Sequence, residues 1–145
     1  MSGRPTEVFL SHASADRVFA DAFAATFIAH GVPVWYSRTN LLDAQLWIEE
    51  IGLALDRCDW FIVLTSNAAT LSTWLKREAG YALGQSQFFG RLSVIALDEC
   101  DPKLVVGALA SIQQTRMSGD FEAACASVLR AWGIGLDHTR IRRPS

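Results

Sequence analysis

The segment from Ser72 to Glu78 places two side chains that can do chemistry one helical turn apart. Trp74 and Glu78 are separated by four residues, and such positions lie on one face of a helix. Ser72 or Thr73 is suited to cap that helix at its start. An indole beside a carboxylate can hold a flat heterocycle while the negative charge stabilises a developing cation. The alternative is a core tryptophan beside a solvated glutamate, and the surrounding elements must decide between the two.

Short apolar runs alternate with amphipathic segments along the chain. Continuous apolar runs predict buried strands, and apolar residues at helical spacing predict helices. Predicted strands cover about 7–11, 32–36, 60–65, 92–97 and 112–115, and predicted helices about 17–30, 44–57, 74–89 and 120–132. Strands that alternate with helices predict an α/β fold with a five-stranded parallel sheet.

An open parallel sheet binds its ligands beyond the carboxyl ends of its strands, where the strand order reverses. With the common order 2-1-3-4-5, that point lies between the first and third strands. Ser11 ends the first strand, His12 follows it, and the helix that carries Glu78 follows the third strand. Topology therefore predicts that Glu78 lies at the ligand site. No glycine-rich phosphate-binding motif follows the first strand, which argues against hydride and phosphoryl transfer.

Composition limits the class of protein. The chain has 145 residues, of which 50% are hydrophobic and 19% charged, which is typical of one compact globular domain. Its formal net charge of −2 argues against nucleic acid or an anionic membrane as a partner. Cys58, Cys100 and Cys125 are widely spaced and the histidines are scattered, so we expect reduced thiols and no metal site. We see no signal peptide or apolar run of membrane-spanning length, and we expect a cytoplasmic protein.

The end of the chain has a different composition. Residues 1–136 are predicted to form one domain. The segment 137–145 contains three arginines and no apolar period, and we expect a disordered basic tail there. A partner-binding extension is the alternative for this segment.

Four motifs resemble those of bacterial TIR (Toll/interleukin-1 receptor) domains. They cover residues 7–16, 34–41, 58–66 and 74–78, in the family's order and with suitable spacing. The resemblance spans about residues 6–132 and implies the flavodoxin-like three-layer fold, with sheet order 2-1-3-4-5 and helices on both faces. Trp74 and Glu78 match the family's W-x-x-x-E pattern. This chain is thus similar to the NAD+-cleaving type of TIR domain.

The loop 37–46 corresponds to the family's BB loop, which contacts a neighbouring TIR domain and helps to cover the nucleotide. Two departures from the family pattern occur there. Tyr36-Ser37-Arg38 stands where an acidic residue often follows the second strand, and Asp43-Ala44 replaces the usual glycine. The missing glycine should stiffen the loop, because positive φ becomes less accessible.

The resemblance implies an NAD+ glycohydrolase or cyclase that releases nicotinamide and either ADP-ribose or a cyclic isomer. Glu78 is the expected catalytic residue, and the candidates for binding the substrate are Trp74, Ser11, His12, Arg38, Ser37 and Trp47. NAD+ is the substrate, and no separate cofactor is expected. The family also implies self-association through TIR–TIR contacts that include the 37–46 loop, and a role in bacterial antiphage defence or signalling. Because the chain is short, we expect its control by self-assembly, by a separate sensor or effector protein, or through its origin as part of a longer chain.

Two other interpretations remain open. A non-catalytic TIR–TIR adaptor module is favoured if Trp35, Trp47, Phe88 and Phe89 form an exposed apolar patch; for Trp47 a core position is the stronger expectation. A relative of the nucleoside deoxyribosyltransferases is the third interpretation, because those enzymes attack an anomeric carbon with a carboxylate. Covalent trapping on Glu78 would distinguish that reaction.

Overall fold

The computed structural model describes residues 3–36, 44–112 and 114–145, and for residues 44–48 and 50 it describes the backbone alone. Its centre is one sheet of five parallel strands in the order β2-β1-β3-β4-β5. The strands are β1 (Val8–Ser11), β2 (Val34–Trp35), β3 (Trp60–Thr65), β4 (Leu92–Ala96) and β5 (Gln114–Arg116). The predicted strand number and strand order are both confirmed.

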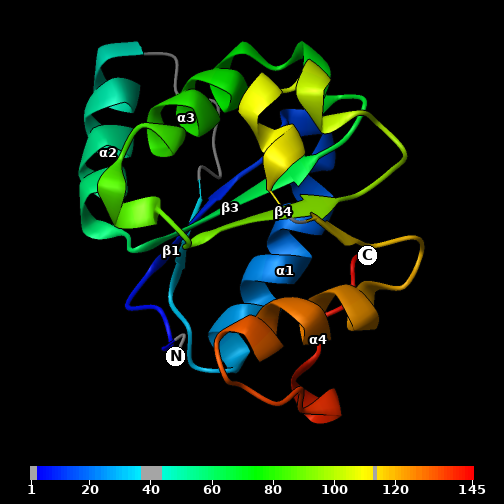
Figure 1. Cartoon of the computed structure of the whole chain (residues 1–145). Coiled ribbons are helices and arrows are strands. Elements are labelled where there is room, and N and C mark those ends of the chain that lie inside the picture. The colour runs from blue at the N-terminus through cyan, green and yellow to red at the C-terminus, as the bar shows by residue number, and fades with distance from the viewer. Residues whose placement is uncertain (1–2, 37–43, 113) are drawn as a thin grey trace.

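Helices cover both faces of the sheet (Figure 1). They are α1 (Arg17–Ala29), α2 (Ala44–Arg57), α3 (Thr73–Leu83) and α4 (Phe121–Ala131). One core cluster joins the sheet to α1 and α4, and a second joins it to α2 and α3. The protein is therefore a three-layer α/β domain, as expected.

The central strand β3 shows why the fold forms. All six of its residues are buried. Successive side chains of a strand point to opposite faces of the sheet, and helices cover both faces here. Ile62 and Leu64 enter the core with α1 and α4, whereas Phe61 and Val63 enter the core with α2 and α3. A continuous apolar run thus supplies both cores at once, which explains the absence of alternation in this segment.

Several predicted boundaries differ from the observed ones. The helix predicted to continue to residue 89 ends at Leu83, and Gly84 is its C-cap. A 3-10 turn over Ser86–Phe88 follows, and it turns the chain back so that Phe88 is buried in the core with α2 and α3. Gly84 was a usable signal for this helix end, since glycine has a low helix propensity.

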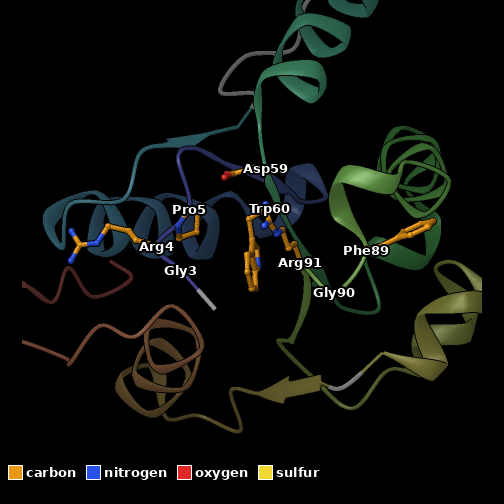
Figure 2. A pocket seen from close by; sticks show the side chains of 8 residues that line it. All are labelled: Gly3, Arg4, Pro5, Asp59, Trp60, Phe89, Gly90 and Arg91. Carbon is orange, nitrogen blue, oxygen red and sulfur yellow. The ribbon is translucent and has the colours of Figure 1, made fainter. Parts of the chain in front are cut away.

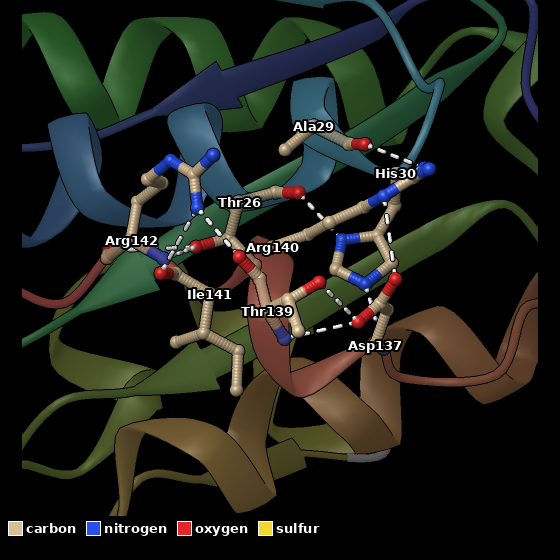
Figure 3. Close-up of polar contacts among 8 residues, drawn as sticks. All are labelled: Thr26, Ala29, His30, Asp137, Thr139, Arg140, Ile141 and Arg142. Carbon is tan, nitrogen blue, oxygen red and sulfur yellow. Dashed lines mark hydrogen bonds and ion pairs between the residues drawn. The ribbon is translucent and has the colours of Figure 1, made fainter.

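The structure corrects the prediction that residues 137–145 form a disordered tail. Residues 137–145 lie against α1 in an ordered segment, which we call the C-terminal strap (Figure 3). His30 Nε2 accepts the Asp137 N–H at 3.0 Å, and the other ring nitrogen, Nδ1, donates to the Thr26 carbonyl at 2.8 Å. Thr26 Oγ1 accepts the Arg142 N–H at 2.9 Å. Thr26 and His30 are buried, so these polar side chains need partners, and the strap supplies them.

Candidate active site

The helix α3 is held so that Glu78 points toward the sheet. Its N-cap is Ser72, whose hydroxyl accepts the Leu75 N–H at 3.2 Å, as the sequence indicated. Leu75 and Ala79 are fully buried against the sheet. Glu78 lies between them along the chain and is only 8% exposed. A carboxyl group in such a position requires a polar partner.

Ser11 is that partner. It is the last residue of β1 and is 1% exposed, and its hydroxyl donates to Glu78 Oε1 at 2.6 Å. Burial raises the pKa of Glu78 to about 7, and the hydrogen bond from Ser11 opposes that rise. At neutral pH the side chain is therefore divided between the acid and the carboxylate. A nearby cation would shift it to the carboxylate, because opposite charge favours the ionised form.

His12 follows Ser11 but faces a different group. Its ring meets the ring of Tyr36 edge-on at 5.7 Å between centroids, and the Tyr36 hydroxyl donates to Asp21 Oδ1 at 2.6 Å. The pKa of His12 falls to about 4, chiefly through burial and then through Arg17, while Asp21 opposes the change. At neutral pH the imidazole is uncharged, so His12 offers a substrate hydrogen bonds rather than a positive charge.

Trp74 lies at the solvent edge of the site, with 40% of its surface exposed. The guanidinium of Arg77 lies over its ring, 5.3 Å from the centroid, in a cation–π contact. One face of the indole therefore already carries a cation. The expected stacking of a substrate ring on Trp74 must accommodate this neighbour.

The structure brings four predicted residues to the carboxyl end of the sheet: Ser11 and His12 from the end of β1, and Trp74 and Glu78 from the first two turns of α3. Ser37 and Arg38, like residues 37–43 of the predicted BB loop, lie outside the described residues. Trp47 belongs to the backbone of α2, but its side chain also lies outside them. Their expected roles therefore remain predictions.

The apolar patch that would favour an adaptor does not form from the members that the structure describes. Phe88 is buried, and Trp35 packs against the core with α2 and α3. Phe89 is 68% exposed, but it lies beyond the end of α3 and next to Gly90. One exposed aromatic side chain of this kind is ordinary for a protein surface.

A second polar contact near the site was not foreseen. Ser66, directly after β3, donates from its hydroxyl to the carboxylate of Asp16, and it accepts the Ala69 N–H at 3.0 Å. Both side chains are buried, and burial raises the pKa of Asp16. The contact ties the loop after β1 to the loop after β3. The only signal for this contact in the sequence was that polar residues follow two adjacent strands. Their spacing along the chain could not show that Asp16 and Ser66 would pair.

The pocket in Figure 2 lies at the other end of the sheet. It has a volume of about 360 Å³ and is lined by residues that precede β1, begin β3 or precede β4, among them Pro5, Trp60 and Arg91. In a parallel sheet these positions share the amino-terminal edge. This pocket is therefore separate from the Ser11–Glu78 pair.

Among the described residues, no three His, Cys, Asp or Glu side chains are grouped as a metal ion would require. The helices in the described part of the chain are all too short or too polar to cross a membrane.

Comparisons with known proteins agree with the observed fold. The sequence model of a family described as "TIR domain" matches residues 8–129. No curated protein matches the chain. Among solved structures, the TIR domains of the activated Roq1 resistosome, which directly recognises the pathogen effector XopQ, superimpose with a TM-score of 0.70 at 16% sequence identity. That match covers 86% of this chain and 98% of the other.

Proposed function

We propose that this chain, which belongs to the TIR domain family, cleaves the bond between nicotinamide and ribose in NAD+. One observation carries the proposal. A buried carboxyl group, Glu78, is held by the Ser11 hydroxyl at 2.6 Å where β1 ends. The carboxyl ends of the strands at the β1–β3 junction are where an open sheet of this order binds its ligands.

The reaction needs stabilisation of positive charge on the sugar. As the bond from C1′ to the nicotinamide nitrogen breaks, its electron pair leaves with neutral nicotinamide and C1′ becomes an oxocarbenium-like cation. Glu78 in its ionised form stabilises that cation, as carboxylates do in glycoside hydrolysis. Burial strengthens this interaction, because little water is present to screen it.

Ser11 holds the carboxylate in place for this role. With 1% of Ser11 exposed and its hydroxyl donating to Glu78, it acts through the glutamate rather than as a nucleophile. Addition of water to C1′, with loss of one proton, gives ADP-ribose. Attack on C1′ by a ring nitrogen of the same molecule's adenine gives a cyclic isomer.

Release of nicotinamide tests the proposal directly. The protein is incubated with NAD+ at high concentration with a crowding agent, beside the variant Glu78→Gln, and products are separated by chromatography. Gln keeps the size of the side chain and the acceptor for Ser11 but has no charge. We expect release by the native chain and none by the variant, and the co-product identifies hydrolase or cyclase. Equal release by both proteins would refute the assignment of Glu78.

Self-association is a second element of the proposal. The solved TIR domains that this fold resembles belong to an assembled resistosome, and Leu71, beside α3, is 85% exposed as an apolar side chain available for contact. We propose that copies of this chain assemble and that assembly promotes cleavage in a cytoplasmic defence or signalling response. Light scattering measures assembly. If the protein assembles but never releases nicotinamide, the non-catalytic adaptor becomes the better interpretation.

A further inference from the structure

The proposed substrate carries two phosphates, and the loop after β1 supplies little charge to bind them. His12 is uncharged at neutral pH, and the Ser11 hydroxyl donates to Glu78. Arg17 begins α1 and lies close enough to His12 to help lower its pKa, but α1 covers the opposite face of the sheet from α3 and Glu78. The helix that carries Glu78 also carries a cation on the same side of the sheet, Arg77.

The helix α3 presents one such cation beside the site. Positions 74, 77 and 78 lie on adjoining parts of one helical surface, with Trp74 in the middle. Glu78 flanks Trp74 on the buried side, and Arg77 flanks it on the exposed side, over the indole ring at 5.3 Å. Lys76 is also exposed, but two residues from Trp74 it lies on another side of the helix.

The guanidinium of Arg77 is available for an anion. Among the described residues, no carboxylate forms an ion pair with it. Its contact with the indole fixes its place without neutralising its charge. A guanidinium so held can bind phosphate oxygens through two N–H groups.

We propose that Arg77 is a specificity-determining residue, which binds the diphosphate of the dinucleotide at the solvent edge of the site. The inference rests on the proposed function. It fits the order of groups in the substrate, since the nicotinamide ribose directly adjoins the first phosphate. With the ribose at buried Glu78, the phosphates extend across Trp74 toward solvent and Arg77.

The same geometry directs the cationic nicotinamide ring. A ring that already faces the guanidinium of Arg77 is a poor partner for a second cation on the same side. The carboxylate of Glu78 attracts the nicotinamide end, and Arg77 attracts the phosphate end. Opposite charges on the two flanks of Trp74 thus fix the direction in which the dinucleotide binds.

The test compares two substrates and two neighbouring cations. Arg77→Met removes the charge and keeps the length of the side chain, and Lys76→Met is the matched control on the same helix. Substrates are NAD+ and nicotinamide riboside, which lacks both phosphates. For Arg77→Met we expect KM for NAD+ to rise roughly tenfold, the usual scale for losing a charge-assisted hydrogen bond. We expect kcat/KM for nicotinamide riboside to stay unchanged, and Arg77→Lys to recover part of the loss.

Binding separates this inference from the proposed reaction. In the Glu78→Gln background, calorimetry measures the Kd of NAD+ with and without Arg77→Met. A roughly tenfold rise in this Kd with Arg77→Met, and no rise with Lys76→Met, supports the role of Arg77. This conclusion holds even if none of the proteins cleaves NAD+, because absence of cleavage refutes only the proposed reaction. An unchanged Kd for NAD+, no NAD+ binding at all, or equal losses with nicotinamide riboside would overturn the inference.

Discussion

Replacing Glu78 by Gln should stabilise the fold while it removes the proposed activity. The pKa of Glu78 is raised from 4.5 to about 7, mainly by burial, so the folded chain disfavours the charged carboxylate. Below pH 4.5 the side chain is neutral in both the folded and the unfolded chain, and no penalty exists. As the pH rises from 4.5 to 7, the unfolded chain loses the proton first, and the folded chain loses stability relative to it. Above pH 7 the penalty is complete.

The size of the penalty follows from the two pKa values. One pKa unit corresponds to about 1.4 kcal/mol, so the change from 4.5 to about 7 gives an upper value of about 3 kcal/mol. Gln removes this penalty and still accepts the hydrogen bond from Ser11. For a chain of this length, about 3 kcal/mol corresponds to a rise in Tm of roughly 6 to 12 °C at pH 8.

Urea denaturation at pH 4.5 and at pH 8 measures the effect, with the free energy of unfolding as the quantity compared. We expect Glu78→Gln to exceed the native chain at pH 8 by up to about 3 kcal/mol, with the difference nearly gone at pH 4.5. Glu99→Gln, at a carboxylate that is 86% exposed, is the control and should change stability by about 0.5 kcal/mol or less at either pH. The same difference at both pH values, or a less stable variant at pH 8, would refute the account of a buried carboxylate.

Three further predictions concern Ser11, His12 and Thr26. Ser11→Ala removes the hydrogen bond that lowers the pKa of Glu78, so the rise of nicotinamide release with pH should move to higher pH; an unmoved profile would contradict the coupling. NMR titration should show no protonation of His12 between pH 5 and 8, because its pKa is about 4; a midpoint near 6.5 would mean an exposed ring. Thr26→Val should cost about 1 kcal/mol and speed hydrogen exchange of the Arg142 amide, whose acceptor it removes; unchanged exchange would mean that the C-terminal strap is not held there.

Much of the fold could be predicted because burial leaves a direct pattern in the chain. The apolar run of β3 and its neighbours specified a sheet with both faces covered, and α2 began and ended at the predicted residues. The resemblance to TIR domains was confirmed by the family match over residues 8–129. The short edge strands and the early end of α3 were harder to predict, since they depend on how the chain turns back onto the core.

The C-terminal strap shows the limit of local patterns. Its polar, basic composition is typical of disorder, yet backbone N–H groups of Asp137 and Arg142 are bound by His30 and Thr26, more than a hundred residues earlier. Thr26 lies on α1 and His30 directly follows it, and the periodicity of this helix shows only its apolar face. No pattern along the chain connects two such distant segments.

For the candidate site, the sequence by itself determined which residues stand at the carboxyl ends of the strands and that Trp74 and Glu78 share a helical face. These properties follow from residue type and helical repeat alone. Tertiary structure decided what each group can do. Only packing buries Glu78 beside Ser11 and raises its pKa, lowers the pKa of His12 and leaves Arg77 exposed beside Trp74. Charge state depends on the loss of water and on distant neighbours, and both arise only when the layers of the fold come together.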